Sequence, residues 1–176
     1  YDEKSERGVA EDNEGARGSG NVLGNAAVAL VAVIGFAASA GMGVDSALFR
    51  FAFTGSLAAA MSDTLSSEIG VLFDEPRLIT TLERVDPGTD GGITWQGYVV
   101  GVVGAGIVAA VAVSIFTFDA PALAALTVVC GGVAGMTVDS ILGATLEGGR
   151  VGNQTVNFLG TLAGAIVSAA LAFVLL

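Results

Sequence analysis

Five long apolar segments dominate the sequence, separated by short polar or glycine-containing stretches. They cover residues 21–41, 45–73, 97–116, 121–146 and 157–176. Each reaches the length of roughly 20 residues that an α-helix needs to cross a bilayer, whereas core helices of soluble proteins are usually shorter and keep a polar face. The pattern therefore predicts an all-α fold, a polytopic transmembrane bundle of about five membrane helices.

Two polar regions lie outside these segments. Residues 1–20 are charged and contain several glycines, and a long loop at about 74–96 holds two of the three prolines. We therefore divide the chain into an N-terminal polar segment, 1–20, and a transmembrane helical domain, 21–176, that includes the loop. The chain begins with Tyr1 and shows no signal peptide. We expect that a preceding part of the protein is missing.

The basic residues orient the predicted bundle. With five crossings, residues 1–20, the long loop and the turn after the fourth helix lie on one side, and together they carry every Lys and Arg except Arg50. Because cytoplasmic loops are enriched in Lys and Arg, this side is predicted to be cytoplasmic and the protein to span the cell membrane several times. Arg50 is close enough to a helix end for its side chain to reach the interface.

Composition agrees with a membrane protein and limits its chemistry. The chain is 53% hydrophobic and 14% charged, with a mean hydropathy of +0.75. Its net charge of −10 opposes nucleic acid as a partner and fits either solvated acidic loops or a salt-adapted organism. Histidine is absent and Cys130 is the single cysteine, which excludes most zinc sites and predicts a packed thiol. Any bound metal is expected to be a hard, oxygen-ligated ion.

Glycines recur at four-residue spacing in three of the segments. The pairs are Gly97 and Gly101, Gly131 and Gly135, and Gly160 and Gly164. Small residues at this spacing let membrane helices approach closely, so we assign these glycines to helix packing.

Polar residues gather at the predicted cytoplasmic ends of four helices. They are Asn21, Asn25, Asp63, Glu68, Asp139, Ser140, Asn153 and Asn157. A weak internal repeat links them, since 55–68 aligns with 131–144 so that Asp63 meets Asp139, and an Asn-x-x-x-Asn pair opens both the first and fifth helices. Such symmetry often marks a site at a repeat interface, although short matches in a Gly- and Ala-rich chain also arise by chance.

The acidic residues indicate a metal site. Carboxylates within membrane helices are costly and normally face a wet cavity or a partner, although an interfacial position or a structural hydrogen bond would also explain them. In a chain without histidine, acids from separate helices predict a Mg²⁺ site that carries phosphates, with Asp63, Glu68 and Asp139 as ligands. On a straight helix Asp63 and Glu68 face directions about 140° apart, so they have different roles or the helix unwinds there.

The long loop adds candidate phosphate-binding residues. Glycine backbone N–H groups in the run from Pro87 to Gly92 could surround an anion, while Asp90 would repel phosphate unless a metal lies between them. The same run is also typical of an ordinary turn. The loop candidates are Arg77, Thr80, Thr81, Gly88, Thr89, Asp90, Gly91 and Gly92.

At these residues the chain resembles the integral membrane family that includes plant phytyl-phosphate kinase and transmembrane protein 19. The matching stretches are AEDNEGARGSGNVLGN, GSLAAAMSDTLSSEIG, PRLITTLERVDPGTDGGITWQG, DSILGATLE and NQTVNFLGTLAGA. The resemblance implies transfer of a phosphoryl group from cytidine triphosphate (CTP) to an isoprenyl monophosphate, and upstream transmembrane helices. The chain departs from the family pattern at Ala16, where an arginine pair is common, and at Ala26 and Ala27, where Gly-Gly is common.

The sequence leads to one hypothesis and two rivals. Asp63, Glu68 and Asp139 would bind Mg²⁺, the loop and Arg77 would bind nucleotide phosphates, and the asparagines would orient the phosphate of a phytyl or geranylgeranyl phosphate at helix N-termini. The lipid tail would stay in the bilayer. The rivals are a membrane transporter or scaffold, and a cytidylyltransferase that makes a CDP-lipid.

Overall fold

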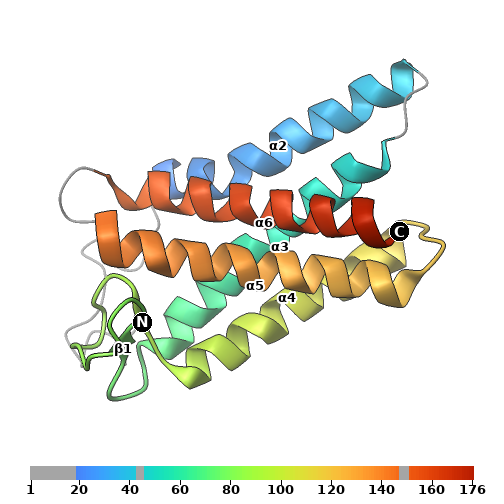
Figure 1. Ribbon diagram of the computed structural model, residues 1–176. Coiled ribbons are helices and arrows are strands. Elements are labelled where there is room, and N and C mark those ends of the chain that lie inside the picture. The colour runs from blue at the N-terminus through green and yellow to red at the C-terminus, as the bar shows by residue number, and fades with distance from the viewer. Residues whose placement is uncertain (1–18, 43–45, 147–150) are drawn as a thin grey trace.

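The fold is a bundle of α-helices that lie side by side (Figure 1). The computed structural model describes residues 19–42, 46–146 and 151–176, so the predicted N-terminal segment lies almost wholly outside the described residues. The described helices are α2 (Ser19–Gly41), α3 (Ala47–Gly70), α4 (Trp95–Ile115), α5 (Pro121–Leu146) and α6 (Asn153–Leu175). The prediction of an all-α helical bundle is confirmed.

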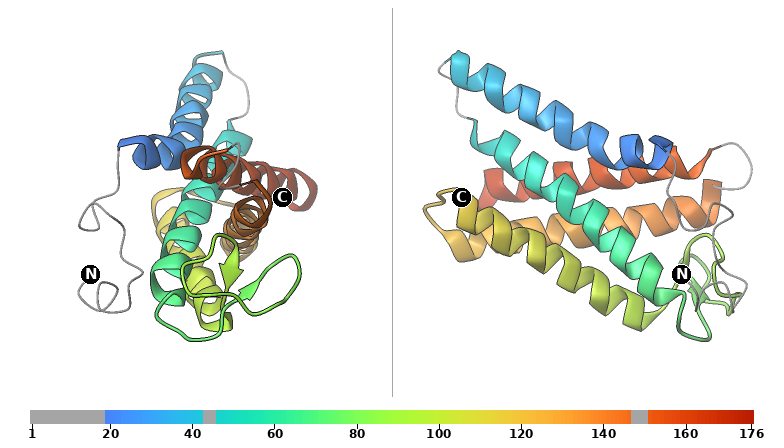
Figure 2. Two further views of the ribbon diagram at one scale, coloured as in Figure 1. Left: turned by 90° about the vertical axis from the view of Figure 1, so that its left-hand side faces the viewer. Right: turned by 180° about the vertical axis from the view of Figure 1, so that it is seen from behind.

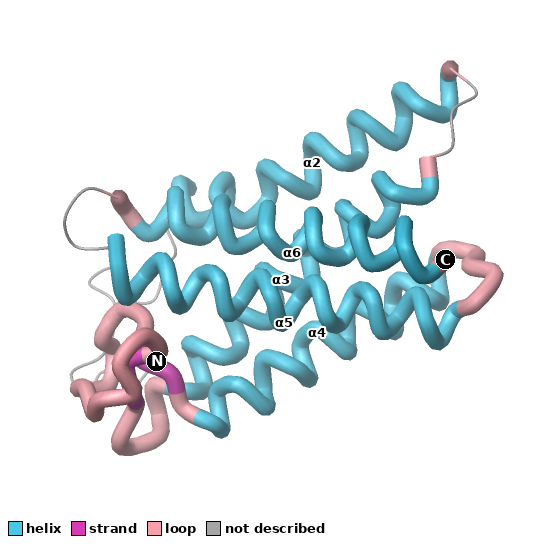
Figure 3. The backbone as a smooth tube through the Cα atoms, viewed as in Figure 1, coloured by secondary structure: helices cyan, strands magenta, loops and turns pink. Residues whose placement is uncertain are grey.

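The helix directions bring the predicted polar ends together. The starts of α2, α4 and α6 lie at the same end of the bundle as the ends of α3 and α5 (Figures 1 and 2). The loop between α3 and α4 covers this end, which we call the loop end, and contains the two short strands (Figure 3). The end of α2, the start of α3 and the α4–α5 connection lie at the other end.

Four of the described helices, α2, α4, α5 and α6, are long and apolar enough to cross a membrane, and α3 is not among them. α3 contacts each of the other four helices. Its buried hydroxyl groups therefore meet protein rather than lipid: Ser62 Oγ, for example, donates a hydrogen bond to the carbonyl oxygen of Gly101 in α4 at 2.9 Å. A central helix can be more polar than its lipid-facing neighbours because its polar groups are satisfied inside the bundle.

The spaced glycines lie in helix contacts, as their spacing predicts. A Cβ added to Gly135 in α5 would lie 2.7 Å from the carbonyl oxygen of Gly160 in α6. A Cβ added to Gly164 would lie 2.6 Å from Ala59 Cβ and 2.8 Å from the carbonyl oxygen of Gly55, both in α3. Backbones thus approach so closely that no side chain fits between them.

We expect Gly164→Ala to destabilise the bundle by about 1–3 kcal/mol, because the added methyl group overpacks α6 against α3 and α5. Gly106→Ala is the matched control, since Gly106 is also helical but has nothing within 4 Å of an added Cβ. Alanine there should be neutral or stabilising by up to about 1 kcal/mol. Thermal unfolding in detergent measures both, and equal melting temperatures for the two variants would contradict the packing role.

The internal repeat has a structural counterpart around α6. Gly55 in α3 and Gly131 in α5 are aligned by the repeat, and both pack against the same residues of α6. Added Cβ atoms would lie 2.6 Å and 2.7 Å, respectively, from the carbonyl oxygen of Gly164. Eight residues later in each helix come Asp63 and Asp139, so matching helix positions carry the two acids to the loop end.

Two details differ from the expectations. Arg50 does not simply extend to the interface: its Nη1 donates a hydrogen bond to the carbonyl oxygen of Thr117 at 3.1 Å, and its guanidinium lies 5.6 Å from the Phe118 ring centre. It thereby fastens α3 to the α4–α5 connection. Cys130 is exposed on α5 and the prediction of a packed thiol is wrong; an apolar run on a membrane helix includes lipid-facing positions.

Candidate functional site

The loop at the loop end is built from paired short strands and consecutive turns. Strand β1 (Arg77–Leu78) pairs antiparallel with β2 (Gly92–Ile93). Between them, Thr89 N donates to Asp86 O at 3.1 Å and Gly92 N donates to Thr89 O at 2.8 Å. Gly88 and Gly91 have φ angles of 85° and 73°, which glycine adopts without strain. The run from Pro87 to Gly92 is therefore a pair of hydrogen-bonded turns.

Gly91 fastens this double turn to α5. A Cβ added there would lie 2.6 Å from both Ser140 O and Ala144 N. Only a residue without a side chain permits this approach, and the positive φ favours the same choice. The turn thus rests directly on the helix that carries Asp139.

We expect Gly91→Ala to detach the loop from α5, because the methyl group meets the helix backbone and the φ angle becomes strained. Trypsin should then cleave faster after the exposed Arg77 and Arg84. Gly152→Ala is the control, because nothing lies within 4 Å of an added Cβ there. Equal cleavage rates in the two variants would show that Gly91 does not hold the loop.

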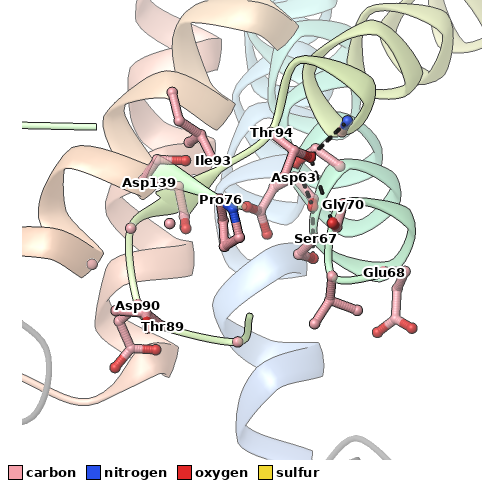
Figure 4. A pocket seen from close by; sticks show the side chains of 18 of the residues that line it. Asp63, Ser67, Glu68, Gly70, Pro76, Thr89, Asp90, Ile93, Thr94 and Asp139 are labelled. Atoms are coloured by element: carbon pink, nitrogen blue, oxygen red, sulfur yellow. Dashed lines mark hydrogen bonds between the residues drawn. The ribbon is translucent and has the colours of Figure 1, made fainter. Parts of the chain in front are cut away.

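A pocket of about 460 Å³ lies between this loop and the ends of α3, α4, α5 and α6. Its volume is within the usual range for small-molecule sites. It brings together most of the residues that the sequence singles out (Figure 4). The predicted residues that line it are Asp63, Glu68, Gly88, Thr89, Asp90, Gly91, Gly92, Asp139, Ser140, Asn153 and Asn157.

Asp63 and Asp139 approach the pocket from different helices, α3 and α5, and Figure 4 shows both among the side chains that line it. Asp139 also lies against α6, since a Cβ added to Gly160 would be 3.1 Å from its Oδ2. α3 does not unwind, and continues as helix to Gly70. Glu68 therefore keeps the different direction expected from its spacing, and its side chain points away from both aspartates.

The arrangement changes the predicted metal site. Among the described residues, no three Asp, Glu, Cys or His side chains are grouped closely enough to hold a metal ion, so Asp63, Glu68 and Asp139 do not form one ligand set. Asp63 and Asp139 still line one pocket, whose other polar lining groups are the carboxylates of Glu68 and Asp90 together with hydroxyl, amide and backbone groups. That donor set fits Mg²⁺, which is commonly held by one or two carboxylates together with water and substrate phosphates.

The described lining is strongly acidic. It contains Asp63, Glu68, Asp90 and Asp139, and none of the described lining residues is Lys or Arg. Carboxylate oxygens are ligands that a divalent ion such as Mg²⁺ prefers, so these side chains could bind an ion that accompanies a phosphate.

Three predicted loop residues do not line the pocket. Arg77 Nη1 donates to Leu82 O at 2.6 Å and so closes the loop on itself. Thr80 and Thr81 are exposed, and Thr81 Oγ1 accepts a hydrogen bond from Glu83 N. We predicted that these residues bind phosphates because they belong to the same loop as the glycine run. In the structure, strand β1 and the turn after it hold them outside the pocket lining.

The four predicted asparagines also differ in whether they line the pocket. Asn153 and Asn157 of α6 line the pocket, whereas Asn25 is half-buried and outside its lining, and the side chain of Asn21 lies outside the described part of the chain. Asn157 is only 7% exposed and lines the pocket, so its amide is placed to contact a bound ligand or water there.

Sequence reasoning missed the contribution of α4. Thr94 caps this helix, its Oγ1 accepting from Gly97 N at 3.1 Å, and Tyr98 OH lies 2.9 Å from Thr137 Oγ1 of α5. Both line the pocket, together with Ser66 and Ser67 of α3. Thr94 could have been recognised as a helix cap before an apolar run. The Tyr98 contact joins residues 39 positions apart, and no local pattern predicts it.

Comparison with known proteins gives the chain its family. The family of integral membrane proteins DUF92 matches residues 1–167. The chain belongs to this family. The DUF92 chain is therefore a multi-pass membrane protein, in agreement with its four apolar helices, and the pocket lies at one end of its membrane helices.

Relatives of this DUF92 chain occur in archaea, plants and cyanobacteria. An uncharacterized membrane protein of Methanocaldococcus jannaschii is 40% identical over 157 residues, which are 88% of this chain and 62% of the relative. The chloroplastic protein VTE6 of Arabidopsis thaliana is 32% identical over 94% of this chain and 51% of its own length. An uncharacterized membrane protein of Synechocystis is 30% identical over 94% and 64%, respectively. The chain thus spans about half to two thirds of these relatives, and no solved structure matches it.

Proposed function

We propose that the protein is a CTP-dependent isoprenyl-phosphate kinase whose pocket opens to the cytoplasm. The observation that carries the proposal is the pocket itself, which Asp63 and Asp139 both line at the end of a bundle of apolar helices. A lipid phosphate and a soluble nucleotide can meet only at such a boundary between bilayer and water. Membership of a family to which a phytyl-phosphate kinase belongs, as the sequence resemblance implies, supports the same class of reaction.

The proposed reaction moves one phosphoryl group. An oxygen of the isoprenyl monophosphate attacks the γ-phosphorus of CTP, the bond from that phosphorus to the β–γ bridging oxygen breaks, and the products are isoprenyl diphosphate and CDP. The attacking oxygen belongs to an ionised phosphate, so the protein need not supply a strong base. Catalysis then depends on alignment and on neutralising charge.

In the proposal, the two aspartates contribute to charge neutralisation by holding a metal ion. Asp63 and Asp139 would hold Mg²⁺, which when bound neutralises charge on the nucleotide phosphates. Their positions on packed helices keep the two carboxylates at a fixed separation. Asp139 is further confined by its contact with Gly160 of α6. Glu68, which points away from them, would lie outside this metal site.

The remaining lining groups would position the two substrates. Asn157 offers a buried amide at the start of α6, where the helix dipole and free N–H groups favour an anion, and would receive the acceptor phosphate. The double turn at 86–92 and Thr94 lie on the loop side of the pocket and would face the nucleotide. The pocket would thus hold donor and acceptor on two sides of the aspartates.

The test supplies the full-length purified protein with Mg²⁺, geranylgeranyl phosphate and CTP, and analyses the lipid product by mass spectrometry. The proposal expects geranylgeranyl diphosphate and an equal amount of CDP. A cytidine-containing lipid would show a cytidylyltransferase instead. No lipid product together with ion flux in vesicles would show a transporter, and either result would overturn the proposal.

A further inference from the structure

A second, apolar cavity lies beside the pocket, between α2 and α6. We call it the α2–α6 groove. It has a volume of about 280 Å³ and is lined by Leu23, Gly24, Gln154, Thr155 and Phe158. Leu23 is 67% exposed, and Phe158 is also exposed. In a membrane protein such exposed apolar side chains at the end of a membrane helix face lipid.

The groove and the pocket share the first two turns of α6. Asn153 and Asn157 line the pocket, while the next residues along the helix, Gln154 and Phe158, line the groove. One helix end therefore presents amide groups to the polar cavity and an aromatic ring to the apolar one. Gly24 allows α2 to approach closely here, because an added Cβ would lie 2.6 Å from Gln154 O.

We infer that the α2–α6 groove holds the isoprenoid chain of the acceptor, next to its phosphate. This inference rests on the proposed function and names the chain-binding residues of that site. The pocket itself is lined largely by polar residues and glycines, so burying a chain of isoprene units there would give little hydrophobic stabilisation. The groove includes the exposed apolar side chains of Leu23 and Phe158, and a Cβ added to its Gly24 would lie 3.5 Å from Asn157 Cβ. A molecule with an anionic head and an apolar chain matches the two cavities in that order.

The two substrates would then approach the pocket from different sides of the bundle. The chain approaches from the α2 and α6 side of the bundle, and the nucleotide from the loop and α4 side. α6 then lies at the junction between lipid and water. Leu23 and Phe158 would set the preference for chain length, because they form the apolar walls nearest the head group.

Photo-crosslinking tests the inference directly. The full-length protein in lipid nanodiscs is labelled with a geranylgeranyl phosphate analogue that carries a diazirine on its first isoprene units. We expect the label on 23–24 or 154–158, removed by excess geranylgeranyl phosphate. Label that is confined to the lipid-facing surfaces of α4 and α5, or that excess ligand does not remove, would overturn the inference.

Substitution at the groove gives a second measurement. Leu23→Trp fills the groove without disturbing packing, because Leu23 is mostly exposed. It should raise KM for geranylgeranyl phosphate at least fivefold while leaving KM for CTP and for the short dimethylallyl phosphate unchanged. Leu126→Trp is the matched control, since Leu126 is 55% exposed on α5, which does not line the groove. Identical KM values in the two variants would overturn the inference.

The product assay and the labelling experiment together distinguish failure of the groove assignment from failure of the proposed reaction. A wild-type protein that is labelled saturably in the groove but makes no diphosphate would refute the proposed reaction and support prenyl-phosphate binding. Diphosphate synthesis with labelling elsewhere would support the reaction and refute the groove. Neither product nor saturable labelling would refute both.

Discussion

Asp63→Asn and Asp139→Asn are each expected to lower kcat for phosphoryl transfer by roughly a hundred- to a thousandfold, because each removes a charge that helps to hold the metal and its phosphates. Asparagine has nearly the same shape as aspartate, so helix packing should be retained. Initial rates at saturating CTP and isoprenyl phosphate measure the loss, and unchanged thermal unfolding shows that the fold is intact.

Two acidic residues serve as controls for these variants. Glu68 lies in the pocket lining but points away from the aspartates, so Glu68→Gln should reduce kcat less than about tenfold. Asp119 lies in the α4–α5 connection at the other end of the bundle, so Asp119→Asn should leave kcat unchanged. Full activity in either Asp63→Asn or Asp139→Asn would contradict the metal assignment. An equal loss in Asp119→Asn would show a general electrostatic effect.

Removal of divalent ions should abolish turnover, by about a thousandfold or more, because a bound metal contributes several kcal/mol of charge stabilisation. The effect should be large here because the metal proposed between Asp63 and Asp139 would neutralise charge on the nucleotide phosphates. Mg²⁺ should restore the rate. Ca²⁺ should not, since it is larger and accepts a looser geometry.

The measurement follows turnover against free Mg²⁺ in a buffered chelator. The control is thermal unfolding in the same chelator, which should still show a cooperatively folded bundle, with the melting temperature lowered only by loss of the bound ion. Turnover that persists without divalent ions would show that other cations, such as the basic residues of the N-terminal segment, neutralise the phosphates.

The helical architecture could be predicted from the sequence because the bilayer imposes length and apolarity on each span. Glycine spacing also predicted which residues allow backbones to approach, as Gly135 and Gly164 show. The central position of α3 could not be predicted, since hydropathy alone does not separate a helix surrounded by protein from one at an interface. Its polar residues have their physical explanation in contacts with all four neighbours.

The sequence could predict that Asp63, Asp139 and Asn157 lie at the same end of the bundle, because the distribution of Lys and Arg indicated the direction of each helix. The finer geometry of the site depended on contacts between distant residues. Gly91 rests on α5 through its backbone, Tyr98 reaches Thr137, and Arg77 turns back on its own loop. None of these contacts has a local sequence signature, so the sequence identified the chemical groups better than their arrangement.

The most direct test of the account follows the phosphorus atoms of CTP. The protein is incubated with Mg²⁺, geranylgeranyl phosphate and CTP labelled with ³²P at either the α or the γ position, and the lipid fraction is counted. The account predicts that γ-label enters the lipid as a diphosphate, that α-label does not, and that Asp139→Asn prevents the transfer. Entry of α-label into the lipid, or γ-label released only as inorganic phosphate, would contradict it.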